Sequence, residues 1–306
     1  MSYGTANASK ANFDDVYTAP TPHAYVAAMA QCGYEIGEQA RPYFTAAVDL
    51  LRERNGDAWP SQMLDLGCSY GLGSAFVKYG CSFDELVAFF ATRAPREYHA
   101  VCEATRVWLH VTPEASPVRC VGLDASKPAI RFAVEAGLLD GGIARDLERP
   151  GATLTHDERA WFRSCNLLIG SGAIGYITER TLGQVLEGFG QDHPGSFGPL
   201  TVVTILRMFD PAPIRAAFER QGFQFEPVPG VRLPQRRFSD EAERRHVLSL
   251  LHDRGVETRE WEEQGKLYAD LFVGGPPEQL PVLRDRMAAV RVGSRKVAGA
   301  AVYIRR

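Results

Sequence analysis

Apolar residues along the chain follow two patterns, one typical of helices and the other typical of buried strands. Residues 44–51 and 182–189 carry apolar side chains at positions i, i+3, i+4 and i+7, which predicts an apolar face on each of two helices. Residues 200–206 (LTVVTIL) are instead apolar or β-branched at successive positions. That pattern indicates a strand buried on both faces, as in a parallel sheet.

The same patterns predict strands alternating with helices along most of the chain. Alternation of this kind is typical of βαβ units, and therefore of a doubly wound α/β domain with a mostly parallel sheet. We expect residues 1–306 to form one such domain, with N-terminal helices in 1–57, a helical insertion at 81–117 and a C-terminal extension at 276–306. The strands are expected at 63–66, 118–123, 143–147, 165–170, 200–206, 223–227 and 266–273. The helices are expected from residue 23, at 44–55, at 72–79, twice within 81–117, at 127–136, at 182–189, around 214–218, from 239 and around 283–290.

The composition is that of an ordinary globular protein. Of the 306 residues, 45% are hydrophobic and 23% are charged, which argues against a disordered chain. A formal charge of −3 does not favour binding to nucleic acid, because phosphate binding usually needs a basic face. No apolar run approaches the roughly 20 residues that span a bilayer, and the first 15 residues lack the apolar segment of a signal peptide. We therefore expect a cytoplasmic protein with no membrane partner.

The spacing of cysteine and histidine argues against a metal site. The chain has six cysteines without a C-x-x-C pair, and its seven histidines show no H-x-x-x-H spacing. We interpret the cysteines as small buried side chains in a reducing compartment, and we expect no bound metal.

The segment DLGCSYG at residues 65–71 is the most informative part of the sequence. A predicted strand runs into a tight glycine turn and then into a helix, at the strand end where doubly wound sheets bind ligands. The turn is no P-loop, and Ser69 stands where G-x-G-x-x-G would require glycine. Asp65 precedes the glycines, and a carboxylate there disfavours a pyrophosphate and favours an ammonium group. The sequence therefore indicates a ligand with a positively charged amine near this turn.

Two further acids follow predicted strands. Asp124 ends the strand at 118–123, where a carboxylate is suited to accept hydrogen bonds from both hydroxyls of a ribose. The usual distance from the glycine turn to such an acid is about 20 residues, so the longer distance here requires 81–117 to be an insertion. Asp146 lies at the end of the next predicted strand, from which it could accept a hydrogen bond from an adenine amino group. An ordinary turn acid is the alternative at each position.

At these residues the chain resembles the class I S-adenosylmethionine-dependent methyltransferases. DLGCSYG matches their acid-x-G-x-G-x-G turn with Ser69 in the middle glycine place, Asp124 matches their ribose-binding acid, and Asp146 matches their adenine-contacting position. The segments VGLDAS, AGLLD, ARDLE, SGAIGYITERT and LPQRRF are similar to a bacterial and fungal subgroup that acts on small molecules. That subgroup includes carboxylic-acid O-methyltransferases and azetidine-2-carboxylate synthases. The resemblance covers residues 13–275 or so.

The resemblance implies a Rossmann-like, seven-stranded sheet with N-terminal lid helices, and S-adenosylmethionine as the cofactor. The cofactor-binding residues that it implies are Asp65, Gly67, Ser69, Gly71, Asp124, Ala125, Asp146, Leu147, Ser171 and Gly172. Tyr176 is the implied catalytic residue, whose ring would meet the sulfonium through a cation–π contact; packing at a helix start is the alternative. The candidate substrate residues are Tyr17, His23, Tyr25, Tyr34 and Arg207.

The candidate substrate residues differ in the position that we expect for them. The aromatic residues and His23 precede the first strand, where they could form a lid that excludes water, or pack in the core. Arg207 follows the fifth strand and could pair with a carboxylate substrate. Arg236 and Arg237 could pair with a carboxylate substrate in the same way, but we interpret them as solvated surface charge. No Asn-Pro-Pro-Tyr sequence follows the fourth strand, which argues against a nucleobase amine as the substrate.

The expected function is methyl transfer to a small molecule in secondary metabolism, with a carboxylate as one candidate acceptor. A carboxylate would need no base, since positioning and desolvation supply the rate. The first alternative is an S-adenosylmethionine cyclase that forms azetidine-2-carboxylate and releases methylthioadenosine. The second alternative is a non-catalytic cofactor-binding subunit that uses 81–117 and the C-terminal VAGAAVYI as an interface. A homodimer is left open.

Overall fold

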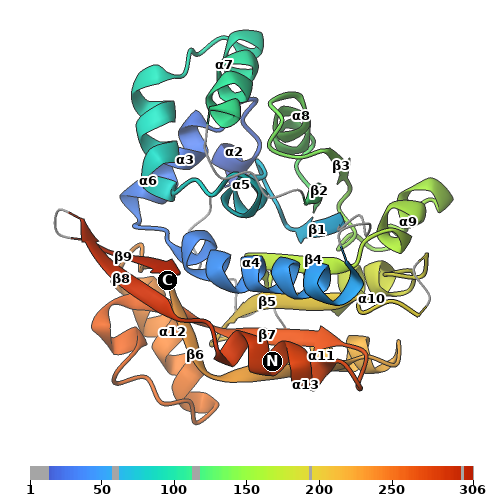
Figure 1. The fold of residues 1–306 in the computed structure, drawn as a ribbon. Helices are drawn as coiled ribbons and strands as arrows, with labels where there is room; N and C mark the ends of the chain where they lie inside the picture. The colour runs from blue at the N-terminus through green and yellow to red at the C-terminus, as the bar shows by residue number, and fades with distance from the viewer. Residues whose placement is uncertain (1–13, 57–61, 112–117, 193–194, 298–299, 306) are drawn as a thin grey trace.

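One seven-stranded sheet forms the centre of the molecule, in the order β3-β2-β1-β4-β5-β7-β6 (Figure 1). The computed structural model describes residues 14–56, 62–111, 118–192, 195–297 and 300–305. Neighbouring strands from β3 to β5 pair in parallel, and β7 pairs antiparallel with both β5 and β6. The predicted Rossmann-like, mostly parallel α/β fold is therefore confirmed. The strands are β1 Gln62–Leu66, β2 Arg119–Asp124, β3 Gly141–Ala144, β4 Leu167–Ile174, β5 Leu200–Leu206, β6 Gln224–Arg237 and β7 Lys266–Gly275.

The strand order reverses beside β1, which pairs with β2 on one side and β4 on the other. All five residues of β1 and all seven of β5 are buried, because helices cover both faces of the sheet. The expected strand at 200–206 coincides with β5. The reversal leaves a crevice at the carboxyl ends of β1 and β4, which is where ligands bind in open α/β sheets.

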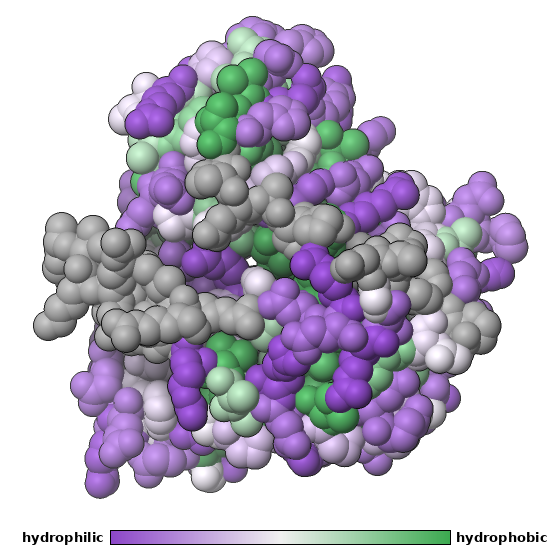
Figure 2. Space-filling model, in the orientation of Figure 1, coloured by the Kyte–Doolittle hydropathy of each residue, from purple (hydrophilic) through white to green (hydrophobic). Residues whose placement is uncertain are grey.

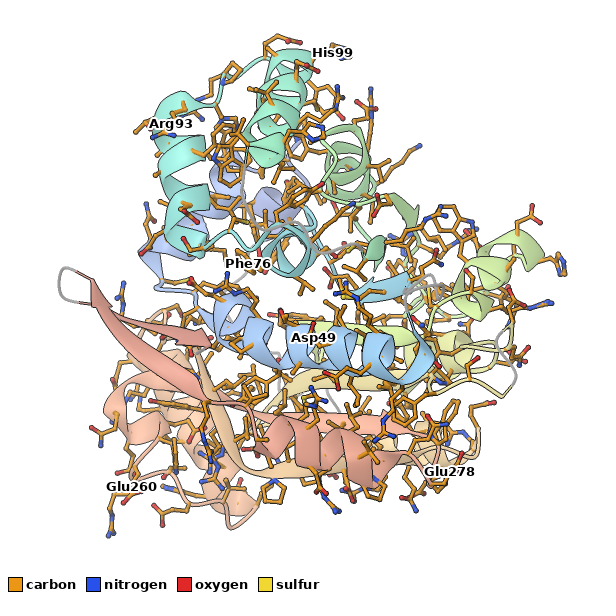
Figure 3. The ribbon with its side chains drawn as sticks, viewed as in Figure 1. Asp49, Phe76, Arg93, His99, Glu260 and Glu278 are labelled. Atoms are coloured by element: carbon orange, nitrogen blue, oxygen red, sulfur yellow. The ribbon has the colours of Figure 1, made fainter. Side chains whose placement is uncertain are left out.

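Helices pack along the sheet and gather above it (Figure 1). The long helix α4 packs against β4, β5 and β6 with α13 beside it, and α8 packs against β2 and β3. Phe76 lies on α5 at its border with α4 (Figure 3), where a Cβ at Gly37 would be 2.9 Å from the ring. These helices are α2 Asp14–Tyr17, α3 His23–Gln31, α4 Ile36–Asn55, α5 Leu72–Tyr79, α8 Lys127–Glu135, α9 His156–Arg163, α10 Glu179–Leu186, α11 Ala212–Glu219, α12 Glu241–Asp253, the short η2 Glu262–Gln264 and α13 Leu280–Ala288.

The expected insertion is mostly helical in its described part, with a non-helical link at 94–97. It comprises α6 Phe83–Ala88, the π-helical turn η1 Phe89–Arg93 and α7 Tyr98–His110, while residues 112–117 lie outside the described part. Ser82 and Glu85 form the capping box that the sequence predicts. α6 and η1 pack against α3, so the insertion and the N-terminal helices form one group above the sheet (Figure 1). Hydrophilic residues cover much of the face in Figure 2, and hydrophobic ones gather over α7.

Three strands differ clearly from their expected bounds. β4 extends to Ile174, although the pattern predicts a strand at 165–170, so Ser171 and Gly172 lie within the strand. β3 ends at Ala144, so Asp146 lies in the turn beyond the strand and not at its end. β6 reaches Arg237, whereas the pattern predicted a strand at 223–227 only. Prolines and a glycine interrupt the apolar alternation of β6, and they are tolerated because β6 is the edge strand of the sheet.

The C-terminal residues form a separate two-stranded antiparallel sheet from β8 Val292–Val297 and β9 Ala300–Arg305. The apolar stretch VAGAAVYI falls on this hairpin, with residues 298–299 outside the described part. The expectation of no signal peptide concerns residues 1–13, which also lie outside it. No helix in the described ranges has the length and apolar character to cross a membrane.

Candidate functional site

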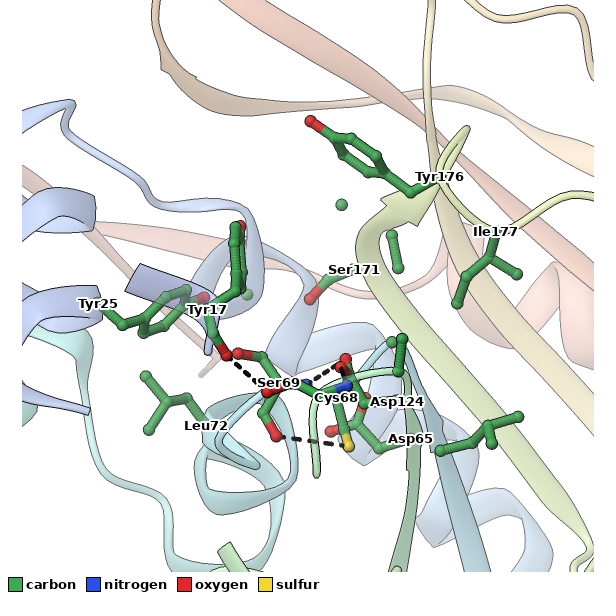
Figure 4. A pocket seen from close by; sticks show the side chains of 18 of the residues that line it. Tyr17, Tyr25, Asp65, Cys68, Ser69, Leu72, Asp124, Ser171, Tyr176 and Ile177 are labelled. Atoms are coloured by element: carbon green, nitrogen blue, oxygen red, sulfur yellow. Dashed lines mark hydrogen bonds between the residues drawn. The ribbon is translucent and has the colours of Figure 1, made fainter. Parts of the chain in front are cut away.

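A cavity of about 840 Å³ lies at the carboxyl ends of β1, β2 and β4, under the N-terminal helices (Figure 4). Its volume is in the upper part of the range of roughly 300–1,000 Å³ that is typical of small-molecule sites. Asp65 and Asp124 lie at its base, with Tyr17 and Tyr25 on one side and Tyr176 on the other. The predicted residues that line it are Tyr17, Tyr25, Tyr34, Asp65, Gly67, Ser69, Asp124, Ala125, Asp146, Leu147, Ser171, Gly172 and Tyr176.

The glycine turn is closely packed between β1 and β4. Gly67 has a φ of +68°, and a Cβ there would lie 2.4 Å from the Cβ of Ala173. Ser69 has a φ of 48°, a left-handed conformation that non-glycine residues rarely adopt. Its backbone N–H donates to Oδ2 of Asp124 over 2.8 Å, which holds this conformation in place. Ser69 is therefore compatible with the tight turn, although glycine adopts this conformation more readily.

Asp65 presents a buried carboxylate to the cavity. Its side chain is 4% exposed, and Oδ2 accepts hydrogen bonds from the N–H of Ser74 at 3.0 Å and the hydroxyl of Ser74 at 2.8 Å. Within the part of the chain that the structure describes, no group donates to Oδ1. Burial raises the pKa of Asp65 to about 6. A carboxylate in this position favours a cation as its missing partner.

Asp124 is positioned by backbone hydrogen bonds from two sides. Oδ1 accepts from the N–H of Ser126, and Oδ2 from the N–H of Ser69, each at 2.8 Å. Burial raises the pKa of Asp124, and these hydrogen bonds oppose the shift. Each carboxylate oxygen has capacity for a further hydrogen bond. Asp124 can therefore accept from two adjacent hydroxyl groups of a ligand.

Asp146 borders the cavity but is engaged with its own neighbours. Oδ1 accepts from the N–H of Glu148 at 3.1 Å, and Oδ2 lies 2.8 Å from Nε of Arg149. Its side chain is 33% exposed. The expected contact with an adenine amino group remains a prediction, and Leu147 beside it is a buried apolar side chain on the cavity wall.

Tyrosine side chains form the wall opposite the acids. The rings of Tyr17 and Tyr25 lie 5.2 Å apart, and Tyr34 and Tyr176 also line the cavity. Burial raises the pKa of Tyr17, Tyr25 and Tyr34, so all three keep their hydroxyl protons at neutral pH. Tyr176 is 51% exposed at the rim of the cavity. An aromatic wall of this kind attracts a sulfonium or ammonium group through cation–π contacts.

The N-terminal segment is held over the cavity by residues that the sequence analysis did not identify. The hydroxyl of Tyr70 lies 2.9 Å from the carbonyl oxygen of Val16 and 2.7 Å from that of Ala19. The hydroxyl of Ser126 donates to the carbonyl oxygen of Tyr17 at 2.7 Å. Tyr70 belongs to the glycine turn, so the turn that positions Asp124 also fixes the predicted lid.

Two of the predicted residues pack away from the cavity. Gly71 has a φ of +76°, and a Cβ there would lie 3.1 Å from Leu139, so its role is close packing behind the turn. His23 packs edge-on against Phe90 at 5.5 Å, and its Nδ1 lies 3.0 Å from the hydroxyl of Thr21. Neither residue lines the cavity, and neither is placed to contact a ligand there.

Two of the three candidate arginines are placed opposite to expectation. Arg207 was expected to face a substrate, but its side chain is 2% exposed and pairs with Glu262 at 2.6 Å, away from the cavity. Arg236 was expected at the surface, but its side chain is 6% exposed, pairs with Glu243 at 2.6 Å and lines the cavity. Arg237, the next residue of β6, is exposed as expected. The error on Arg236 follows from the unrecognised length of β6.

The sequence analysis missed other lining residues. Leu72 and Gly73 directly follow the glycine turn, so its extent could have indicated them. Gln235 on β6 belongs to LPQRRF, one of the segments that carry the resemblance, which could have indicated it. Among the described residues, no group of three or more metal-ligating side chains lies together. The missed residues are Thr18, Met29, Gly37, Cys68, Leu72, Gly73, Phe76, Phe83, Leu123, Ser126, Arg145, Glu148, Arg149, Ala173, Ile177, Thr181, Gln235 and Arg236.

Comparison with known proteins yields similarities to solved structures only. No protein-family model and no curated protein matches the chain. Magnesium protoporphyrin IX methyltransferase from Synechocystis with bound SAH is 11% identical, with 81% of this chain and 87% of that one covered and a TM-score of 0.37. The plantazolicin methyltransferase BpumL in complex with SAH is 9% identical, with 90% and 95% covered and a TM-score of 0.39. The cyclase SpnF is 11% identical, with 76% and 81% covered and a TM-score of 0.36. At these identities and TM-scores the similarities do not indicate the activity of this protein, and the evidence for its activity comes from the cavity.

Proposed function

We propose that the cavity binds S-adenosylmethionine and that the protein transfers its methyl group to a small-molecule acceptor. The observation that carries this proposal is a pair of carboxylates, the buried Asp65 and the half-buried Asp124, which line one cavity from adjacent parallel strands. Asp65 has an oxygen available to a cation, and Asp124 offers both oxygens to hydroxyl groups. An ammonium group and a ribose on one ligand would satisfy both.

The chain's own residues fit the parts of this cofactor. Asp65 would hold the ammonium group, Asp124 the two ribose hydroxyls, and Leu147 would pack against the adenine. The tyrosine wall would face the sulfonium and keep water out, which matters because water competes for a reactive methyl donor. When bound, S-adenosylmethionine supplies an electrophilic methyl group on a positively charged sulfur.

The acceptor is one that needs no base from the protein. The described cavity lining contains neither histidine nor lysine, burial keeps Tyr17, Tyr25 and Tyr34 protonated, and burial also raises the pKa of the Cys68 thiol well above its usual value. The lining acids Asp146 and Glu148 already accept hydrogen bonds from other residues of the protein. We therefore propose a carboxylate acceptor, which is already ionised at neutral pH. An acceptor oxygen forms the bond to the methyl carbon as the carbon–sulfur bond breaks, and no proton is transferred.

Analysis of the adenosine by-product tests this function. The protein is incubated with S-adenosylmethionine, with and without a mixture of small carboxylic acids, and the products are separated by mass spectrometry. We expect S-adenosylhomocysteine only when an acceptor is present. Methylthioadenosine without an acceptor would show cyclisation instead, and neither product from cofactor-loaded protein would show a non-catalytic subunit. Asp253→Asn on the exposed end of α12 is the control variant, and its products should match those of the wild type.

Binding of S-adenosylhomocysteine is expected to depend on pH through Asp65. In the free protein its pKa is about 6, and an ammonium partner would lower it, so the carboxylate must lose its proton for tight binding. Affinity should be constant above about pH 7 and about tenfold weaker at pH 5. Methylthioadenosine lacks the ammonium group, so its affinity, measured by calorimetry, should not show this weakening at pH 5. The same pH profile for both ligands would contradict the role of Asp65.

A further inference from the structure

Gln235 on β6 is a polar residue that is held firmly in the wall of the cavity. It lines the cavity and is only 5% exposed. Its backbone carbonyl oxygen accepts a hydrogen bond from the N–H of Glu35 at 2.7 Å. Two residues along the strand, the N–H of Arg237 donates to the carbonyl oxygen of Cys32 at 2.9 Å. The backbone around Gln235 is therefore fixed by the segment that precedes α4.

One end of the Gln235 amide packs against β4. A Cβ at Gly172 would lie 2.9 Å from Nε2 of Gln235, so the amide fills the space that a side chain at residue 172 would need. The hydroxyl of Tyr34 lies 3.1 Å from the same Cβ position. Because Nε2 is confined in this way, Oε1 at the other end of the amide also has a fixed place.

Oε1 of Gln235 is buried and has no hydrogen-bond partner among the described residues. Buried polar atoms are nearly always hydrogen-bonded, and an unpaired one costs stability. Of the unpartnered buried atoms in the described ranges, only this one and Oγ of Ser69 belong to residues that line the cavity. The hydroxyl of Ser69 can donate or accept, whereas a side-chain carbonyl oxygen only accepts. Gln235 therefore lacks a donor.

The nearby donors of the protein are engaged elsewhere. Three hydrogen bonds direct the guanidinium of Arg236 to the carboxylate of Glu243 and to the carbonyl oxygen of Arg237. The hydroxyl of Tyr34 makes a hydrogen bond with the side chain of Ser171. The donor for Gln235 has to come from outside the described chain. A hydrogen bond at this atom would be sheltered from solvent, which strengthens it.

We propose that Oε1 of Gln235 accepts a hydrogen bond from an N–H or O–H group of a ligand in the cavity. The inference rests on the proposed function and deepens it. The donor is either the ammonium group of the cofactor, which has N–H groups beyond the one that Asp65 needs, or a hydroxyl or amino group that the acceptor carries besides its carboxylate. In the second case Gln235 selects hydroxy or amino acids over plain carboxylic acids.

The test compares variants of Gln235 with the wild type in two arms. Gln235→Met and Gln235→Leu remove both polar ends of the amide, and Gln235→Glu keeps an acceptor oxygen. Gln224→Met is the matched control, since Gln224 is exposed on the same strand and lies outside the cavity lining. The first arm measures dissociation constants of S-adenosylhomocysteine and methylthioadenosine by calorimetry. The second arm titrates hexanoate against 6-hydroxyhexanoate, and benzoate against 4-hydroxybenzoate and 3-aminobenzoate, into protein saturated with S-adenosylhomocysteine.

The two sources of the donor predict different results. If the acceptor supplies it, the wild type should bind the donor-bearing acid of a pair about tenfold more tightly, and Gln235→Met and Gln235→Leu should lose this preference. If the cofactor supplies it, the same two variants should weaken S-adenosylhomocysteine by about tenfold and methylthioadenosine by less than about twofold. Gln235→Glu should behave like the wild type in the arm that responds, and Gln224→Met in both.

Thermal melting of the ligand-free variants adds an independent readout. Gln235→Met should melt at the wild-type temperature or above it, because the unpaired carbonyl oxygen is removed. A Gln235→Glu variant that loses binding as Gln235→Met does would show that the ligand meets a donor, and would overturn the inference. It would also be overturned if the wild type does not distinguish the paired acids and Gln235→Met binds S-adenosylhomocysteine normally, since a water molecule alone would then partner Oε1. A wild type that binds no S-adenosylhomocysteine would instead overturn the proposed function.

Discussion

Replacing Asp65 with asparagine is expected to weaken S-adenosylhomocysteine binding at pH 7.5 by about a hundredfold and to make the unliganded protein more stable. Binding weakens because the amide cannot neutralise the ammonium group. Stability rises because a buried carboxylate of pKa about 6, against an ordinary 3.8, is costly to ionise in the folded protein. At roughly 1.4 kcal/mol per pKa unit, the gain is at most about 3 kcal/mol.

The effect of Asp65→Asn on the free energy of unfolding is expected to depend on pH. Since folding raises the pKa of Asp65, the stabilisation by its proton is present below pH 3.8 and is lost as the pH rises through 6. Asp65→Asn should therefore be more stable than the wild type above pH 6, and the difference should shrink towards pH 4. Calorimetric titration and chemical denaturation at both pH values measure the two effects. Asp253→Asn is the control, and a variant that binds normally would remove Asp65 from the site.

Replacing Asp124 with asparagine is expected to weaken both S-adenosylhomocysteine and methylthioadenosine by about a hundredfold. Both ligands contain the ribose, and an amide has only one acceptor oxygen for the N–H groups of Ser69 and Ser126. One buried N–H loses its partner, which should also cost about 1–3 kcal/mol of stability. The Ser69 turn, with its positive φ, should loosen as a result.

The two aspartate variants together separate the halves of the cofactor. Asp65→Asn should leave methylthioadenosine binding within about twofold of the wild type, since that ligand has no ammonium group, whereas Asp124→Asn should not. Calorimetry with both ligands on both variants measures this contrast. If both variants weakened both ligands equally, the division of roles between the acids would be wrong.

The central part of this site was predictable because short-range rules fix it. Strand, glycine turn and helix follow one another within a few residues, so Asp65 and Ser69 could be placed at a strand end before any tertiary contact was known. Asp124 could be placed in the same way, although a helical insertion precedes its strand. The cavity contains all three. The mostly parallel sheet follows from the same alternation of strands and helices, whereas its strand order does not.

The remaining residues depend on long-range packing. Gln235 and Arg236 reach the cavity only because β6 continues past its prolines as an edge strand, and no apolar period marks that continuation. No neighbour of Arg207 in the sequence indicates its ion-pair partner, because the fold brings Glu262 to it from a distant part of the chain. His23 faces Phe90 because the insertion packs against α3, which no pattern in either segment indicates.

The side chains that line the cavity are consistent with methyl transfer without a protein base. In the proposed function two acids hold the cofactor, aromatic side chains surround it, and the described lining offers neither histidine nor lysine as a base. Positioning and exclusion of water are then the main contributions of the protein. Tyr70 and Ser126 contribute by fixing the segment that covers the cavity.

Calorimetric titration of the purified protein with S-adenosylhomocysteine tests the central claim most directly. We expect one molecule to bind per chain with a dissociation constant in the micromolar range or tighter, and the Asp124→Asn variant to bind about a hundredfold more weakly. The absence of binding to folded wild-type protein at ligand concentrations up to about 1 mM would contradict the account.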